Sequence, residues 1–210
     1  TEAGVELILS DSQYTPYLLM QANDEEKIPW EQFTSIQEER VRYYAQRYQP
    51  MAYEVITEPS QYAAYSGIAM PEDADELALW VAQARRLAQA VREESPNTLV
   101  GVTISLIDDL DLDFYEQALT LDELDFIGVR VFQPGAFDVL EDLFAERGHP
   151  ADHGKELWLL ETWYGYCLAP QRSMDLDAMW LETVTAFAAK ERISTVLVND
   201  YGCFIQEGGT

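Results

Sequence analysis

The sequence predicts an α/β protein of the (β/α) TIM-barrel type, formed by one domain over residues 1–210. Short runs of Val, Ile and Leu alternate with longer amphipathic segments along the whole chain, and polar residues follow each apolar run. With 48% hydrophobic residues the chain can bury a sizeable core. No linker, low-complexity stretch or short-period repeat divides it.

Six apolar runs have the length and composition of strands. They are mostly not polar at alternate positions, which is expected of strands buried on both faces of a parallel sheet. The predicted strands are Val5–Leu9, Met51–Ile56, Leu99–Leu106, Phe126–Phe132, Glu156–Leu160 and Thr195–Val198.

The segments between these runs have the periodicity of amphipathic helices. One of them begins after Asp73 or Asp75, either of which can cap it. Its apolar residues recur at spacings of three and four: Leu77, Trp80, Val81, Ala84, Leu87, Ala88 and Val91. Further helical faces are marked by Trp30, Phe33, Val41 and Tyr44, and by Met179, Val184, Phe187 and Ala188. Shorter helices are predicted over residues 113–119 and 137–144.

Strand–helix units in series predict a parallel sheet with right-handed crossovers, which is either an open doubly wound sheet or a barrel. An open sheet usually has a glycine-rich nucleotide site after its first strand. Neither a glycine-rich turn nor a GxxxxGK sequence occurs here, because the glycines in and near the predicted strands occur singly. The barrel is therefore favoured.

The formal net charge of −25 argues against nucleic acid and anionic membranes as partners, because both are bound through Lys and Arg. No apolar run approaches the roughly 18 residues that a membrane helix needs. The two cysteines, Cys167 and Cys203, are too few and too far apart for a zinc site, and we expect them to lie near each other.

The segment Tyr53-Glu54-Val55-Ile56-Thr57-Glu58-Pro59 places carboxylates within and directly after a predicted strand. Regular alternation would put Glu54, Ile56 and Glu58 on one face. Glu54 lies well inside a buried strand and must be paired or hydrogen-bonded. Pro59 ends the ladder and leaves Glu58 at the rim, where it is either a catalytic group or the cap of a following helix.

This segment resembles the fourth barrel strand of clan A glycoside hydrolases, which often reads tyrosine-glutamate-x-x-asparagine-glutamate-proline. Tyr53, Glu54, Glu58 and Pro59 match, whereas Thr57 stands where the family usually has the asparagine that holds the sugar 2-hydroxyl. The resemblance implies that Glu58 is the catalytic acid/base and that Thr57 contacts the sugar.

A second segment, residues 155–165, resembles the seventh strand of the same clan, which ends in the nucleophilic glutamate. Glu161 takes that position, and Trp163 and Tyr164 can stack on a sugar ring. Glu58 and Glu161 are about 100 positions apart, which is about three units of a barrel that devotes about 31 residues to each. Three units separate a fourth strand from a seventh.

The remaining matches are looser. Residues 125–132 resemble the sixth strand, from which we expect Arg130 or Gln133 in the site, and Asn199 and Tyr201 follow the predicted eighth strand. In this mapping the chain lacks the first two βα units and the last helix. Such a barrel cannot close, so another stretch of chain or a partner is expected to complete it.

The resemblance implies a retaining glycoside hydrolase that acts on a β-linked oligo- or polysaccharide by double displacement, with carboxyl groups about 5–5.5 Å apart. It implies no metal and no organic cofactor. A competing interpretation is a non-catalytic barrel that binds glycans or serves as a structural subunit. An aldolase-like enzyme is a third, but it needs a Schiff-base lysine at a strand end, and all three lysines lie elsewhere.

Overall fold

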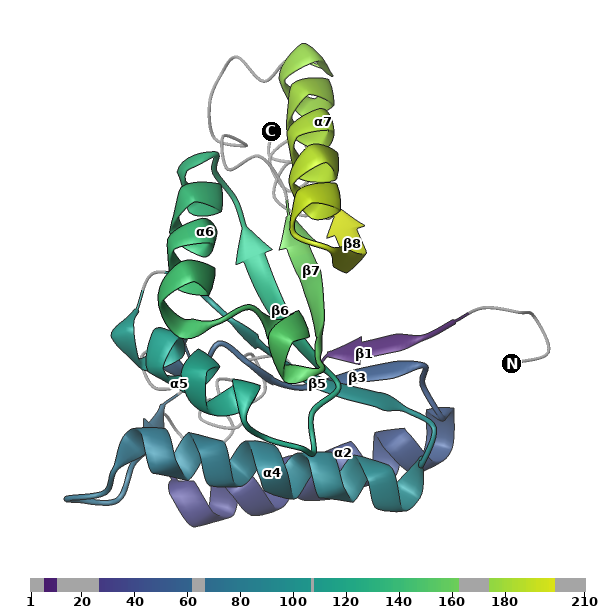
Figure 1. The fold of residues 1–210 in the computed structure, drawn as a ribbon. Coiled ribbons are helices and arrows are strands. Elements are labelled where there is room, and N and C mark those ends of the chain that lie inside the picture. Colours follow the sequence, from purple (N-terminus) through teal and green to yellow (C-terminus); the bar gives the residue numbers. More distant parts are fainter. Residues whose placement is uncertain (1–5, 11–26, 62–66, 107, 163–173, 199–210) are drawn as a thin grey trace, which may run out of the picture.

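The computed structural model describes residues 6–10, 27–61, 67–106, 108–162 and 174–198. Within them a six-stranded parallel sheet curls into a half-barrel with helices on its outer side (Figure 1). Its strands lie in the order β1 (Ile8–Ser10), β3 (Ala52–Thr57), β5 (Leu99–Ile104), β6 (Phe126–Val131), β7 (Glu156–Thr162) and β8 (Ile193–Val198). The predicted fold class is confirmed: β1 and β8 are the two ends of the sheet and do not pair with each other.

The observed strands overlap every predicted run. β8 begins two residues before the predicted start, and the beginning of the first run, Val5, lies outside the described residues. A short parallel pair, β2 (Ile28–Pro29) with β4 (Ile68–Ala69), was not predicted, because two residues are too short to show a pattern.

The helices follow the strands as expected. They are α2 (Trp30–Tyr48), α4 (Glu76–Glu94), α5 (Asp109–Leu119), α6 (Gly135–Arg147) and α7 (Met174–Lys190), with a 3₁₀ turn η1 (Pro150–His153). Of the two candidate caps of α4, Asp75 is the one used: its Oδ1 accepts from the Ala78 amide at 3.1 Å. α5 begins four residues before the predicted Asp113.

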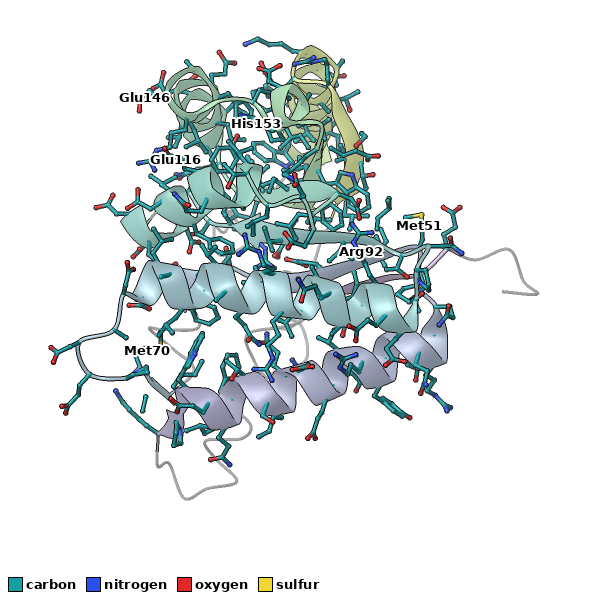
Figure 2. The ribbon with its side chains drawn as sticks, turned by 60° about the horizontal axis from the view of Figure 1, so that its bottom comes forward. Met51, Met70, Arg92, Glu116, Glu146 and His153 are labelled. Atoms are coloured by element: carbon teal, nitrogen blue, oxygen red, sulfur yellow. The ribbon has the colours of Figure 1, made fainter. Side chains whose placement is uncertain are left out.

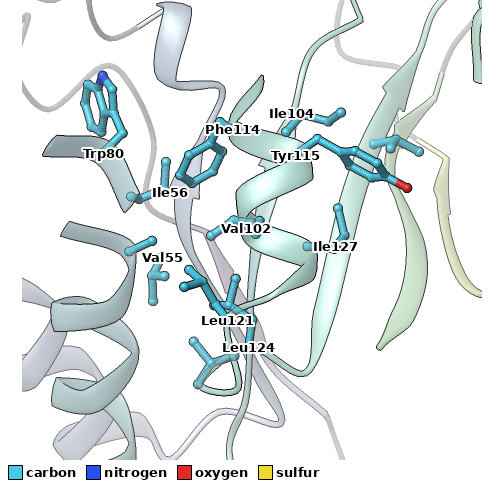
Figure 3. Close-up of a cluster of buried hydrophobic side chains, with 14 of the residues drawn as sticks. Val55, Ile56, Trp80, Val102, Ile104, Phe114, Tyr115, Leu121, Leu124 and Ile127 are labelled. Atoms are coloured by element: carbon cyan, nitrogen blue, oxygen red, sulfur yellow. The ribbon is translucent and has the colours of Figure 1, made fainter. Parts of the chain in front are cut away.

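The main core lies between the sheet and these helices. Val55 and Ile56 of β3 and Val102 of β5 are fully buried there with Trp80 of α4 and Phe114 of α5 (Figure 3). Apolar side chains from both layers therefore fix the helices on the outer face of the sheet.

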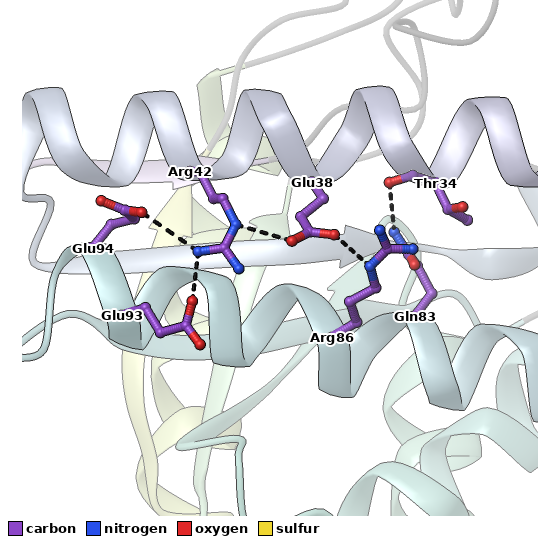
Figure 4. Close-up of polar contacts among 7 residues, drawn as sticks. All are labelled: Thr34, Glu38, Arg42, Gln83, Arg86, Glu93 and Glu94. Atoms are coloured by element: carbon purple, nitrogen blue, oxygen red, sulfur yellow. Dashed lines mark hydrogen bonds and ion pairs between the residues drawn. The ribbon is translucent and has the colours of Figure 1, made fainter.

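Polar contacts also join α2 to α4 (Figure 4). Arg42 contacts Glu38 of its own helix at 2.9 Å and Glu93 of α4 at 2.6 Å, and Glu38 in turn contacts Arg86. The buried amides of Gln37 and Gln83 are hydrogen-bonded to each other at 2.9 Å. Exposed ion pairs of this kind stabilise a fold by less than about 1 kcal/mol each, so burial of the apolar faces remains the main contribution.

A second, smaller core fills the concave side of the sheet near the amino ends of the strands. The ring of Phe126 stacks on Trp158 at a centroid distance of 4.0 Å, with an interplanar angle of 7°, and Ala52 packs beside them. A Cβ atom on Gly101 would lie 2.3 Å from the Phe126 ring, so this position requires glycine. The polar groups described below lie further along the same strands, toward their carboxyl ends.

Acidic side chains occupy the outer surface, as the net charge requires. Glu116 of α5 and Glu146 of α6 are exposed (Figure 2). Arg92, at the end of α4, pairs with Asp125 at 2.9 Å and ties α4 to the turn before β6. None of the described helices is both long and apolar enough to span a bilayer.

We expect Gly101→Ala to destabilise the protein by about 1–3 kcal/mol, because the added methyl group overlaps an aromatic ring that is itself stacked. Chemical denaturation with urea measures the change. Gly135→Ala is the matched control, since a Cβ there has no neighbour within 4 Å. Equal effects of the two substitutions would contradict the close packing inferred for Gly101.

Candidate active site

Three glutamates gather around one arginine at the carboxyl ends of β3, β6 and β7. Arg130 of β6 places Nη1 at 3.0 Å from Glu58 Oε2 and 3.1 Å from Glu161 Oε2. Its Nη2 lies 3.9 Å from Glu54 Oε1. In a parallel barrel the carboxyl ends of the strands share one rim, and catalytic groups collect there.

The register of the sheet brings Arg130 and Glu161 together. Arg130 is the direct neighbour of Glu161 in the β6–β7 ladder, beyond an irregularity at Val129. Arg130 and Glu161 thus come from adjacent strands, whereas Glu58 reaches the same guanidinium from β3, with β5 lying between β3 and β6.

Glu54 and Glu58 both face Arg130, as the expected alternation requires, but the expectation that Ile56 shares their face is wrong. The β3–β5 register shifts between Glu54 and Ile56, so β3 contains a bulge. Val55 and Ile56 are both buried in the outer core, and Thr57 joins Glu54 instead, its Oγ1 donating to Glu54 Oε1 at 2.8 Å. The expectation that Glu54 must be paired is confirmed by this bond and by the contact with Arg130.

Thr57 connects the glutamates to the edge strand. Its Oγ1 lies 3.4 Å from Ser10 Oγ, at the end of β1. Ser10, Thr57, Glu54 and Arg130 therefore form a continuous polar chain across β1, β3 and β6. Thr57 is 2% exposed, so little of its surface remains for a ligand.

Glu58 lies directly after β3 and is 6% exposed. Its pKa is raised to about 7: burial is the largest cause, the positive charge of Arg130 opposes it, and the negative charges of Asp111, Glu161 and Glu54 add to it. A carboxyl group with a pKa near 7 can both donate and accept a proton at neutral pH.

The carboxyl groups of Glu58 and Glu161 are close to each other. Because one nitrogen of Arg130 contacts an oxygen of each, those two oxygens are at most about 6 Å apart. Glu161 is the more exposed of the two, with 22% of its side chain accessible against 7% for Glu58. Both carboxyls thus contact the same cation, but Glu58 is buried with a raised pKa, whereas Glu161 is more accessible.

Of the remaining sequence-predicted site residues, Gln133 is the one that the structure describes, and it is not brought to this cluster. Gln133 is exposed between β6 and α6, and no side-chain contact within the described parts of the chain links it to the glutamates. Six further predicted positions lie outside the described residues: Trp163, Tyr164, Asn199 and Tyr201, together with Cys167 and Cys203.

Asp111 of α5 is a residue of the site that the sequence analysis missed. It is fully buried and accepts from the Ser60 amide at 2.8 Å and the Ser105 amide at 2.7 Å. A signal was present, because Asp111 shares a helix face with the buried residues Tyr115 and Ala118. An aspartate on a buried face requires partners from elsewhere in the fold.

No group of three or more His, Cys, Asp or Glu side chains suited to a metal ion occurs among the described residues. The buried lysine, Lys155, lies before β7 at the opposite end of the strand from Glu161. Its Nζ donates to the carbonyls of Leu121 and Leu124 at 2.6 and 3.0 Å, which is a structural role.

The sequence matches no protein-family profile, and no curated protein matches it in sequence. Solved structures are similar in fold. A glucosidase from Croceicoccus marinus aligns with a TM-score of 0.60 at 13% identity, over 94% of this chain and 43% of its own. A family 1 β-glucosidase from Thermotoga maritima gives 0.61 at 12% identity, over 94% and 64% of the two chains. An endo-1,4-β-mannanase from Rhizomucor miehei gives 0.55 at 14% identity, over 77% and 51%.

These similarities confirm, at the level of the fold, the resemblance to barrel glycoside hydrolases. The chain spans about two fifths to two thirds of the length of these structures, in agreement with a partial barrel. At such identities the fold is shared, and activity has to be argued from the site.

We expect Glu58→Gln to stabilise the protein at alkaline pH. The folded pKa of Glu58, about 7, lies above the ordinary 4.5, so its contribution to stability is fully present below pH 4.5 and is lost as the pH rises through 7. Glutamine resembles the protonated form and lacks this loss, which amounts to on the order of 3 kcal/mol by pH 8.

Thermal unfolding of both proteins between pH 4.5 and 8 measures this difference. The gap in Tm between the variant and the wild type should widen with pH, whereas Glu146→Gln, on an exposed side chain of α6, should leave the pH dependence unchanged. A gap that stays constant with pH would contradict the raised pKa.

Proposed function

We propose that this protein is a retaining glycoside hydrolase that cleaves a β-linked glycan, with Glu161 as the nucleophile and Glu58 as the acid/base. The observation that carries the proposal is the pair of carboxylates from β3 and β7 that share Nη1 of Arg130 at the carboxyl end of the half-barrel. Their contacting oxygens are at most about 6 Å apart, a limit that is compatible with the 5–5.5 Å between the carboxyl groups of retaining enzymes.

The two steps follow from the positions of the groups. A carboxylate oxygen of Glu161 bonds to the anomeric carbon while the bond to the leaving oxygen breaks, and Glu58 gives its proton to that oxygen. A water molecule then attacks the same carbon and loses its proton to Glu58. The bond to Glu161 breaks, and Glu161 is released as a carboxylate.

The difference in burial supports this division of roles. Glu58 is the more buried group, and its pKa near 7 keeps a large fraction protonated at neutral pH. Glu161 is more accessible to a substrate, and Arg130 compensates its negative charge at 3.1 Å. A nucleophile must be ionised and reachable, and an acid must hold its proton until the bond breaks.

The charge of the cluster also suits the reaction. Among the described residues, three glutamates surround the positive charge of Arg130, so negative charge is in excess in this part of the site when they are ionised. The transition state of glycoside cleavage resembles an oxocarbenium ion, and such a site stabilises its developing positive charge. A bound sugar has to compete with Arg130 for the oxygens of Glu58 and Glu161.

The similar structures suggest the first substrates to test, because they are described as glucosidases and a 1,4-β-mannanase. Aryl β-glucosides and β-mannosides and soluble β-1,4-linked polymers are therefore the starting panel. Thr57, which stands where the family usually has asparagine, also affects which substrate can bind. Its hydroxyl already donates to Glu54, so it can only accept a hydrogen bond from a sugar.

We expect Glu161→Ala to lower kcat by at least about 10³-fold on an aryl β-glycoside, and Glu58→Ala to be partly rescued by azide. Rescue occurs because a small anion reaches the glycosyl-enzyme without needing a general base. Glu146→Ala, on the outer face of α6, is the control and should keep wild-type rates.

Steady-state kinetics with and without azide distinguish the outcomes. If the wild-type protein retains glycans on an affinity column yet hydrolyses none of the panel, the non-catalytic binding barrel replaces the hydrolase. If it hydrolyses them and Glu161→Ala does too, the residue assignment is wrong.

A further inference from the structure

Glu58 is held in a backbone conformation that it would not adopt unaided. Its φ of 51° lies in the left-handed region, which is unfavourable for residues other than glycine by about 1 kcal/mol or more. Its amide donates to the Thr103 carbonyl at 2.8 Å, and its own carbonyl accepts from Gln61 at 2.9 Å. The segment after β3, in which a helix begins at Pro59, is thereby attached to β5, but these bonds do not supply an acceptor for the amide of Ser60 in the first turn of that helix.

Asp111 supplies that acceptor. One carboxylate oxygen accepts from the amide of Ser60, two residues after Glu58, and the other from the amide of Ser105, directly after β5. Bonds from amides to a buried carboxylate are short and roughly twice as strong as those between neutral groups. One side chain of α5 therefore ties together the ends of two neighbouring strands at the rim of the site.

These contacts are not those of an ordinary helix cap. Asp108 caps α5, its Oδ1 accepting from the Leu110 amide at 2.9 Å. Asp111, in the first turn of the same helix, has a carboxylate that accepts from the turn after β3 and from the end of β5. The free energy that it costs to bury the Asp111 carboxylate is offset by these hydrogen bonds to residues beside the site.

We propose that Asp111 is a positioning residue which, through the amides of Ser60 and Ser105, holds Glu58 in its strained turn facing Arg130 and Glu161. The inference rests on the proposed function and extends it to a residue outside the substrate cleft. Asp111 acts on the reaction through Glu58 and touches neither substrate nor nucleophile.

The same placement affects protonation. Four charged groups surround Glu58: Glu54 from β3, Arg130 from β6, Glu161 from β7 and Asp111 from α5. After burial and the opposing effect of Arg130, the negative charge of Asp111 is the next largest influence, and it raises the pKa of Glu58. Burial raises the pKa of Asp111 itself, and the hydrogen bonds from the amides of Ser60 and Ser105 lower it in part.

Asp111→Asn is the discriminating variant, because an amide keeps the size of the side chain but replaces one acceptor oxygen with a donor. We expect kcat to fall by about 10–100-fold with KM changed by less than about threefold. The alkaline limb of the kcat/KM profile should move to lower pH by at least about 0.5 unit, whereas Arg130→Gln should move it to higher pH. Asp109→Asn, exposed on the same helix, removes an equal charge and should change neither quantity.

A double-mutant test separates positioning from a general loss of structure. In the Glu58→Ala background, azide-rescued turnover should be insensitive to Asp111→Asn, since the group on which Asp111 acts is absent. An equal loss in both backgrounds would overturn the proposal. Asp111→Ser, whose hydroxyl can rotate to accept from an amide, serves if Asp111→Asn does not fold.

A titration of Glu58 by ¹³C NMR is independent of turnover. The proposal expects its pKa to fall in Asp111→Asn relative to the wild type. If the shift appears in a protein without hydrolase activity, the proposed function fails and the positioning role stands. If turnover is present and neither the titration nor the pH profile moves, the positioning role fails and the function stands.

Discussion

The ion cluster around Arg130 is the interaction on which the site depends. Its side chain is 16% exposed and its guanidinium faces three carboxylates, from β3, from the residue directly after β3 and from β7, two of which are almost fully buried. Removing one partner of a buried ion pair leaves an uncompensated charge, at a cost of about 3–5 kcal/mol. Arg130 thus allows Glu54, Glu58 and Glu161 to lie within one small region, where without a cation they would repel one another. The same closeness makes Glu58 a weak acid and places it near a second carboxylate.

The rest of the concave side supports this cluster in layers. The stacked rings of Phe126 and Trp158 fill the amino-terminal end, and Gly101 leaves room for them. The bulge in β3 then turns Val55 and Ile56 outward and returns Thr57 to the side of Glu54. Asp111 completes the rim from outside the sheet. Packing at one end and hydrogen bonds at the other therefore set where the carboxylates lie.

Much of this was predictable because burial leaves a strong pattern. The strands and helices follow from apolar runs and helical spacing, and the pairing of Glu54 follows from the cost of a buried charge. The bulge was not predictable, since Val55 and Ile56 are both apolar and an extra residue between them leaves no trace in the sequence. Asp111 was overlooked in a run that also contains Asp108, Asp109 and Asp113, although its helical spacing to Tyr115 and Ala118 places it on the apolar face of α5. Arg130 was expected at the site, but its contact with both Glu58 and Glu161 depends on the curvature of the sheet, which brings β3 toward β6 and β7.

Trapping the covalent intermediate tests the central claim, that Glu58 and Glu161 act as a pair, most directly. A 2-deoxy-2-fluoro β-glycoside with a good leaving group slows both steps and lets the glycosyl-enzyme accumulate, after which peptide mass spectrometry locates the sugar. We expect one sugar per chain, attached to the peptide that contains Glu161, in the wild type and in Glu146→Ala but not in Glu161→Ala. Attachment to another carboxylate, or turnover of the parent glycoside with no adduct, would contradict a double displacement at this site.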